Sequence, residues 1–289
     1  ITIKLKHSDN VFDRNMKELD RKMQRRQIFF PFAILSLILF VVSSCQYNEE
    51  VPSEELTIFA ASSLRETFDD LKLAFESKTP HTDIQINYAS TSTLRAQIEH
   101  GAKADLFASA NDKQVVKLSS GGYTRGDPVA FAQNDLMLVV SKKTPAIDSF
   151  TDILTPGLKI VTALHEVPIG EYTLIAIREI DSSGYYGKEF PTNFTQNIVS
   201  QETNVRSMLS RVVLGEVDAA IVYSTDISKQ LDSSVKRIPF PIELNIKPTY
   251  SIVTLEQQDK KKVADEFIAF LSSSKGTEIL VENGFRPIK

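Results

Sequence analysis

The chain has 289 residues, a formal net charge of −4 and 42% apolar residues. This length suits one large or two medium domains, and the apolar fraction suits a buried core. The weak acidity gives no sign of nucleic-acid binding, so we expect no nucleic-acid partner. The four histidines show no metal-site spacing, and the single cysteine, Cys45, excludes an intramolecular disulfide.

The N-terminal segment has the features of a secretory signal. Basic residues precede an apolar run at 28–42, which is shorter than the ~20 residues of a transmembrane helix. The junction Val42-Ser43-Ser44-Cys45 resembles a bacterial lipobox, in which the cysteine becomes the lipidated first residue of the mature protein. An uncleaved membrane anchor is the alternative. Met16 and Met23 both suit a translation start.

The residues after Cys45 predict a tether and then an α/β unit. Residues 46–54 are polar, so we expect the folded part to start near Glu55, outside the cytoplasmic membrane. Residues 56–60 predict a buried strand. Residues 64–75 carry apolar side chains at spacings of four, three and four, which predicts an amphipathic helix. Ser63 and Glu66 fit a capping box at its start.

The next segments repeat this alternation. Residues 84–88 alternate apolar and polar, which predicts a strand. Leu94 and Ile98 share a helix face that ends near Gly101, and residues 104–108 predict another strand. The order β-α-β-α-β is typical of a parallel sheet covered by helices.

The second half continues the α/β alternation and therefore suggests two lobes of similar build. Strands are predicted at 136–140, 158–161, 219–223 and 250–255, and helices at 172–180, 204–214 and 262–271.

Several short motifs occur in a fixed order over about residues 55–289. They resemble those of the periplasmic molybdate-binding proteins of molybdate ABC transporters. The motifs are Ala61-Ser62-Ser63-Leu64, QIEHGAKADLF at 97–107, Ser109-Ala110-Asn111, VPIGEY at 167–172, Asn204-Val205-Arg206, GEVDAAIVYSTD at 215–226 and a terminal GFRP at 284–287.

The resemblance implies a fold and a function. The fold is an α/β, two-lobed periplasmic-binding-protein fold (type II-like), in which each lobe is a sheet flanked by helices and the ligand lies in the cleft between the lobes. Lobe one would comprise 55–133 and 247–289, and lobe two 134–246. The function is that of a non-enzymatic extracytoplasmic receptor, anchored to the membrane by lipidated Cys45. It captures molybdate, and tungstate too, for an ABC permease and its ATPase. We expect a monomer with no cofactor beyond the ligand.

Five residues correspond to the family's ligand-contacting positions. Each supplies a hydroxyl or a backbone N–H: Ser63, Thr91, Ile169, Val205 and Tyr223. Helix N-termini and small residues let an anion approach unpaired N–H groups, and hydroxyls add neutral donors. Thr91 replaces a common serine but keeps the hydroxyl. Ile169 replaces a common alanine, and its bulk could reshape the cleft wall.

Each of these positions also has a purely structural interpretation. Ser63 could be only a helix cap, and Ser90 or Ser92 could supply the hydroxyl in place of Thr91. Tyr223 could be a core aromatic, and Ile169 and Val205 resemble ordinary packing residues.

Neighbouring charges raise a separate question. Charged residues on early helix turns are usually solvated, so we do not assign an anion clamp to Arg65, Arg95 or Arg206. Asp226 is expected to orient backbone or cap a helix, because a carboxylate repels an oxyanion.

Two rival functions remain open at this stage. The first is a receptor for another tetrahedral oxyanion, sulfate or phosphate. Phosphate retains a proton near neutral pH and favours a carboxylate acceptor, which the matched positions lack; sulfate differs mainly in size. The second is a serine hydrolase using Ser63. No Gly-x-Ser-x-Gly elbow surrounds Ser63, and His165 is the only candidate base.

Overall fold

The structure is a computed structural model that describes residues 54–144, 147–184, 186–187, 189–256 and 262–288. The predicted signal segment, Cys45 and residues 46–53 of the tether lie outside the described residues. Residues Pro52–Lys289 form one compact unit, which contains two sheets.

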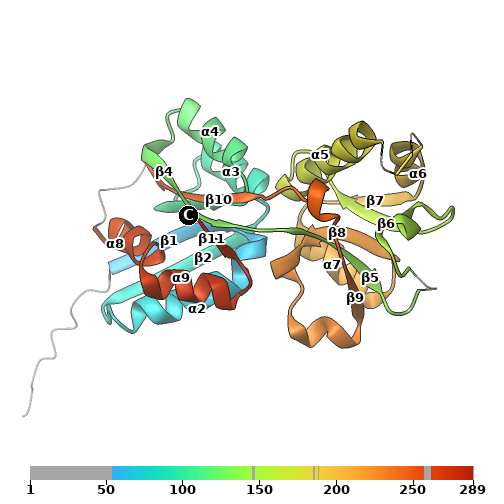
Figure 1. Cartoon of the computed structure of the whole chain (residues 1–289). Helices are drawn as coiled ribbons and strands as arrows, with labels where there is room; N and C mark the ends of the chain where they lie inside the picture. The colour runs from blue at the N-terminus through green and yellow to red at the C-terminus, as the bar shows by residue number, and fades with distance from the viewer. Residues whose placement is uncertain (1–53, 145–146, 185, 188, 257–261, 289) are drawn as a thin grey trace, which may run out of the picture. The chain divides into compact units, whose positions relative to one another are not determined.

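The first sheet has six strands in the order β11-β4-β10-β3-β1-β2 (Figure 1). β1 pairs in parallel with β2 and β3, which confirms the predicted β-α-β-α-β order. β10 runs antiparallel to β3 and β4, so the complete sheet is mixed rather than parallel. The strands are β1 (Glu54–Ala61), β2 (Thr82–Ala89), β3 (Leu106–Ser109), β4 (Thr124–Gln133), β10 (Thr249–Leu255) and β11 (Arg286–Pro287).

Helices cover both faces of this sheet (Figure 1). On one face lie α2 (Arg65–Glu76), α8 (Lys262–Leu271) and α9 (Ser274–Glu282), and on the other α3 (Thr91–Glu99) and α4 (Asp112–Ser120). Successive side chains of a strand point to opposite faces. Accordingly, Leu56 and Ile58 of β1 belong to the core cluster of Phe68, whereas Phe59 belongs to the cluster of Leu94. Burial on both faces explains the continuous apolar run of β1.

The second sheet has five strands in the order β7-β6-β8-β5-β9. Its strands are β5 (Leu136–Ser141), β6 (Ile160–Ala163), β7 (Ile198–Glu202), β8 (Ala219–Tyr223) and β9 (Val235–Pro239), and its helices α5 (Pro168–Ser183), α6 (Phe190–Gln196) and α7 (Val205–Leu214). α5 starts four residues before the predicted 172, because Pro168 suits the first helical position. Short 3-10 helices lie at Ser62–Leu64, Phe150–Leu154, Ser224–Asp226, Lys229–Ser233 and Ile242–Leu244.

Two segments connect the sheets. Residues 134–135 lead from β4 to β5, and residues 240–248 lead from β9 to β10 (Figure 1). The Asn134 N–H donates to the Pro248 carbonyl over 3.0 Å, so the two connections lie side by side. The predicted lobe boundaries lie after residue 133, where β4 ends, and after residue 246, inside the second connection.

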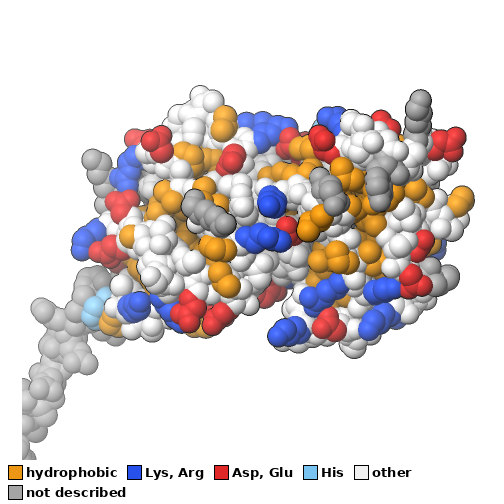
Figure 2. Space-filling view, in the orientation of Figure 1, with side chains coloured by type: hydrophobic (Ala, Val, Ile, Leu, Met, Phe, Trp, Pro, Cys, Tyr) orange, Lys and Arg blue, Asp and Glu red, His pale blue; other side chains and the backbone are white. Residues whose placement is uncertain are grey.

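The surface and composition of the described part add three observations. On the face shown in Figure 2, acidic and basic side chains are interspersed and do not gather into one patch of a single sign. Within the described ranges, no helix combines the length and apolarity needed to cross a bilayer. The same residues contain no group of three or more His, Cys, Asp or Glu placed to hold a metal ion.

Candidate functional site: a small cavity between the sheets

One small cavity lies where the two sheets' helices meet. All five residues predicted from the family resemblance line it. The cavity holds about 210 Å³ of atom-free space, part of which opens to solvent. A space of this size suits a small ligand. The lining residues are Ala61, Ser62, Ser63, Ser90, Thr91, Ala110, Val167, Pro168, Ile169, Val205 and Tyr223.

Four helix starts supply most of this lining. Ser63 belongs to the 3-10 turn that leads into α2, and Thr91, Ile169 and Val205 lie in the first turns of α3, α5 and α7. The first N–H groups of a helix have no partner within it and carry a partial positive charge. The lining contains no Asp, Glu, Lys or Arg. The cavity is therefore electropositive without a formal charge, which suits a small anion.

The start of α5 is open toward the cavity. Its N-cap, Val167, provides no side-chain cap, and Pro168 has no N–H to satisfy. A Cβ on Gly170 would lie 2.1 Å from the Leu164 carbonyl oxygen and 2.8 Å from that of Ala163. Only glycine permits this approach, which fixes the position of the neighbouring Ile169 N–H. The Ile169 side chain is itself buried.

Ser63 does not cap a helix, so the capping-box prediction for Ser63 and Glu66 is wrong. Neither the 3-10 turn nor α2 receives a side-chain cap. The Ser63 hydroxyl lies 3.0 Å from the Tyr250 hydroxyl, and Glu66 pairs with Arg206. A contact with a distant strand thus replaces the local one.

Thr91 and Ser90 have different roles in the structure. The Ser90 hydroxyl caps α3 by accepting the Thr93 N–H at 3.2 Å, and it also bonds the hydroxyls of Ser92 and Thr93. The Thr91 hydroxyl accepts the Ala110 N–H at 3.2 Å. That bond uses a lone pair of Thr91 and leaves its proton uncommitted, so Thr91 is the better donor to a ligand.

Tyr223 ends β8 and lines the cavity. Its hydroxyl is buried and has no hydrogen-bond partner among the described residues. Burial raises the pKa of Tyr223 well above its ordinary value, so the hydroxyl keeps its proton. A buried hydroxyl without a partner is unfavourable, and an anion in the cavity would provide the missing acceptor.

Asp226 orients backbone, as the sequence predicted. Its Oδ2 accepts the Tyr223 N–H at 3.0 Å, and its Oδ1 lies 3.8 Å from Arg206 Nε. Burial raises the pKa of Asp226 to about 7, against the opposing effects of Arg206 and the Tyr223 N–H. Asp226 does not line the cavity.

Two of the three arginines beside the motifs make contacts away from the cavity. Arg65 lies over the Tyr88 ring, 4.3 Å from its centroid, and Arg95 bonds Gln114 and Glu99. These contacts agree with the expectation that they do not form an anion clamp.

Arg206 instead connects the two sides of the cavity, and a second contact does the same opposite it. Arg206 Nε donates to the Ser62 carbonyl at 3.1 Å, and its NH1 donates to Glu66 at 2.8 Å. On the other side, Glu171 of α5 accepts from Lys113 at 2.6 Å and from Asn111 at 3.3 Å. These two sets of contacts join the walls of the cavity on two sides.

The serine-hydrolase alternative finds no support in this geometry. The hydrogen-bond partner of Ser63 is a phenol, and burial raises the pKa of Tyr250 well above its ordinary value, so Tyr250 is no general base. His165 is largely exposed and lies 3.1 Å from Glu166. It does not line the cavity.

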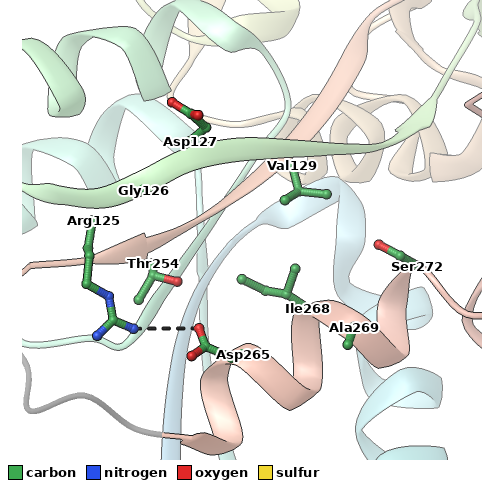
Figure 3. A pocket seen from close by; sticks show the side chains of 9 residues that line it. All are labelled: Arg125, Gly126, Asp127, Val129, Thr254, Asp265, Ile268, Ala269 and Ser272. Carbon is green, nitrogen blue, oxygen red and sulfur yellow. Dashed lines mark ion pairs between the residues drawn. The ribbon is translucent and has the colours of Figure 1, made fainter.

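A more open hollow with about 1100 Å³ of atom-free space lies between β4 and α8 (Figure 3). Arg125 reaches toward Asp265 there, at 3.6 Å, and the lining also includes Asp127, whose side chain points away from this pair in Figure 3. The acidic groups and the paired arginine make this hollow a poor oxyanion site. The small cavity remains the candidate.

The structure also identifies residues that sequence reasoning did not place in the site. Ser62 and Ala110 belong to the quoted motifs but had no assigned role there, although they line the cavity, and Ser90, expected only as an alternative to Thr91, lines it as well. Tyr250 forms a hydrogen bond with Ser63, and Asn134 forms one with Tyr250; no local sequence pattern predicts either contact.

Comparisons with known proteins agree with the fold. Residues 56–286 match the profile of a family described as bacterial extracellular solute-binding protein. The chain is 30% identical over 234 residues to the molybdate-binding protein ModA of Mycobacterium tuberculosis, covering 81% of this chain and 85% of the relative.

Two further comparisons extend this likeness. A Bacillus subtilis protein, provisionally named ABC transporter substrate-binding lipoprotein YvgL, is 28% identical over 278 residues, which cover 91% of this chain and 99% of the relative. A solved structure described as the substrate-binding domain of a provisionally assigned molybdenum ABC transporter from Clostridium difficile has a TM-score of 0.62 and 25% identity. It covers 82% of this chain and 100% of that one.

Proposed function

Because the chain belongs to the family of bacterial extracellular solute-binding proteins, we propose that it captures molybdate, and tungstate as well, for an ABC permease. The observation that carries this proposal is the cavity itself. It combines hydroxyls that have uncommitted protons with the starts of four helices, and no charged side chain lines it. A tetrahedral dianion requires hydrogen-bond donors on all sides, and this lining offers them.

The donor set argues against phosphate. Near neutral pH phosphate carries a proton, which needs an acceptor in the site. The cavity lining contains no carboxylate. Bound hydrogen phosphate would therefore lose a hydrogen bond that water provides, and an unmade hydrogen bond of a charged group is unfavourable by ~1.5–3 kcal/mol.

Size distinguishes molybdate from sulfate. The two ions carry the same charge, but sulfate is smaller. A cavity whose walls are joined by contacts on two sides cannot contract freely around the smaller ion. Some of sulfate's oxygens would then lie too far from their donors. The names of two relatives, which mention molybdate and molybdenum, support the larger ion.

The site residues follow from this proposal. The hydroxyls of Ser63, Thr91 and Tyr223 donate to the oxyanion, and the backbone N–H groups of Ile169 and Val205 complete its shell. The ligand is cargo and no cofactor is needed. The protein acts as a monomer and performs no catalysis.

Delivery would take place at the outer surface of the cytoplasmic membrane. The permease and its ATPase receive the ion, and lipidated Cys45 keeps the receptor near them. The lipoprotein name of the Bacillus subtilis relative supports this part of the proposal.

The proposal is tested by calorimetric titration of the ligand-free soluble domain with molybdate, tungstate, sulfate and hydrogen phosphate. An ester-hydrolysis assay on the same sample tests the rival enzyme class. We expect tight binding of molybdate and tungstate, weak binding of the other two ions and no hydrolysis. Equal affinities for sulfate and molybdate, or ester turnover that depends on Ser63, would contradict the proposal.

A further inference from the structure

Three side chains form a hydrogen-bonded series that ends at the cavity. Asn134, on the connection between β4 and β5, directs Nδ2 to the Tyr250 hydroxyl at 3.4 Å. The Tyr250 hydroxyl lies 3.0 Å from the Ser63 hydroxyl, which lines the cavity. All three side chains are buried, Asn134 and Tyr250 completely. Because they are buried, these polar groups depend on hydrogen bonds within the protein rather than on bulk water.

The orientation of the Asn134 amide follows from its other partners. Its Oδ1 accepts the Asp135 N–H at 2.9 Å and the Ser224 hydroxyl at 3.0 Å. A backbone N–H can only be met by the amide oxygen, so the amide nitrogen must face Thr225, at 2.8 Å, and Tyr250. Asn134 is thus a donor toward Tyr250.

The direction of the next bond is then determined. The Tyr250 oxygen accepts from Asn134, and its own proton needs an acceptor. Burial raises the pKa of Tyr250 well above its ordinary value, so this proton is present at neutral pH. The amide nitrogen of Asn134 cannot accept it, and the other hydrogen bond that the described structure gives the Tyr250 hydroxyl is the one to the Ser63 oxygen, at 3.0 Å. Tyr250 therefore donates to Ser63, and the Ser63 proton is free to point into the cavity.

We propose that Tyr250 and Asn134 are positioning residues that make the Ser63 hydroxyl an obligate donor toward the ligand, so that the site selects fully deprotonated oxyanions over protonated ones. This inference rests on the proposed function. It adds the means of selection. Two residues that do not line the cavity, Tyr250 and Asn134, fix the direction in which the Ser63 hydroxyl donates.

The selection has a simple physical origin. A molybdate or tungstate oxygen can accept the Ser63 proton whichever way the ion is rotated. Hydrogen phosphate presents one O–H, and at Ser63 this group would meet another proton. Without the hydrogen bond from Tyr250, the Ser63 hydroxyl could rotate and accept the proton of hydrogen phosphate. Hydrogen bonds in series also strengthen one another, so Ser63 becomes a better donor.

The first test is Tyr250→Phe combined with Ser63→Ala in a double-mutant cycle. Phenylalanine keeps the ring contacts of Tyr250 with Phe285 and Tyr223, whose centroids lie 5.2 and 5.8 Å away. We expect Tyr250→Phe to weaken molybdate binding about three- to tenfold. In the Ser63→Ala background the same change should have no further effect, because its path to the ligand is gone.

The second test uses Asn134→Asp to reverse the direction of the hydrogen bonds between Asn134, Tyr250 and Ser63. A carboxylate at this position accepts the Tyr250 proton, so Tyr250 would accept from Ser63 and turn the Ser63 proton away from the cavity. Above neutral pH, molybdate and hydrogen phosphate are both dianions, so the added charge repels them alike. The ratio of molybdate affinity to hydrogen phosphate affinity should fall in Tyr250→Phe. In Asn134→Asp it should fall at least as far.

The matched control is Tyr88→Phe. The Tyr88 hydroxyl donates to Asp69 at 2.7 Å, in the same sheet but outside the cavity lining. It should leave both affinities and their ratio unchanged. Additive losses in the cycle, or an unchanged ratio in both test variants, would overturn the inference while molybdate binding by the wild type upholds the proposed function. A wild type that binds no oxyanion would overturn both.

Discussion

Arg206 at the start of α7 donates from Nε to the carbonyl oxygen of Ser62 over 3.1 Å. The same guanidinium pairs with Glu66 at the start of α2. Because Val205 and Ser63 line the cavity beside these two partners, the bond holds two sides of the proposed site together. The arginine thus joins two walls of the cavity and does not line it.

Arg206→Gln should therefore speed the release of molybdate. Without the guanidinium the bonds to Ser62 and Glu66 are lost, and we expect the affinity to fall about three- to tenfold, mainly through faster dissociation. The expectation is modest because Glu66 is half exposed and the pair is screened by solvent. Stopped-flow dissociation measures the effect.

Glu66→Gln is the control for this variant, since it removes the charge pair but leaves the Arg206 bond to Ser62 in place. It should have the smaller effect. A dissociation rate unchanged in Arg206→Gln would show that these contacts have no part in retaining the ligand.

Gly170→Ala should damage binding through the backbone. Its Cβ would lie 2.1 Å from the Leu164 carbonyl oxygen, so the start of α5 must move and carry the Ile169 N–H with it. Gly276→Ala provides a matched control. Gly276 is also the third residue of its helix, and its Cβ would lie 2.3 Å from the Phe270 carbonyl oxygen, but it is not in the cavity lining.

Both glycine variants should unfold more easily, by about 1–3 kcal/mol, from overpacking. Only Gly170→Ala should also lose molybdate affinity, by about tenfold or more for one displaced donor to a charged group. Urea unfolding and calorimetry on both proteins separate the two effects. Equal affinities in the two variants would remove α5 from the site.

The five cavity residues and the failed cap at Ser63 show what the sequence could predict and what it could not. Strands and helices that bury a face were predicted because their apolar periodicity is local, and the order of motifs placed five residues in one cavity. The capping box at Ser63 failed because its hydroxyl bonds Tyr250, 187 positions away, and a tertiary partner leaves no trace in local spacing.

The serine-rich turn at 90–92 shows the same limit at smaller scale. The pattern Ser90-Thr91-Ser92 offers three hydroxyls, and only the structure separates the cap from the candidate donor. Ser90 adopts the extended conformation of an N-cap and bonds Thr93, whereas Thr91 meets the Ala110 N–H of the segment after β3. Which hydroxyl keeps a free proton depends on that second contact.

Asp226 should give the stability a specific pH dependence. Its pKa rises from 3.8 to about 7 on folding because it is buried. Between these values the native state holds a proton that the unfolded state has lost, so this group's contribution to stability falls as the pH rises toward 7. Asp226→Asn lacks the titration, so wild type should lose stability relative to the variant between pH 5 and 7.

Urea unfolding of both proteins across this range measures the difference, which cancels the titration of the other groups. A constant difference in unfolding free energy between wild type and Asp226→Asn would mean that Asp226 is ionised throughout, held by Arg206 at 3.8 Å.

Cys45→Ala tests the proposed anchor, which lies outside the described residues. If Cys45 is the lipidated residue, the variant should leave the membrane fraction or accumulate as an unprocessed precursor. Cell fractionation and the mass of the protein measure this. Ser44→Ala, which keeps a small residue before the cysteine, should remain anchored. A Cys45→Ala protein processed and retained like wild type contradicts the lipoprotein assignment.

Tyr223→Phe offers the most direct measurement of the central claim, that buried hydroxyls in this cavity hold the oxyanion. The Tyr223 hydroxyl has no protein partner within the described residues, so its removal should leave the ligand-free protein equally stable, or up to ~1–3 kcal/mol more stable. Molybdate affinity should nevertheless fall roughly ten- to a hundredfold. Tyr172→Phe, whose ring lies 6.5 Å away outside the lining, is the control and should bind normally. Calorimetry and urea unfolding on the same sample give both numbers, and a Tyr223→Phe protein that binds molybdate as tightly as wild type would contradict the account.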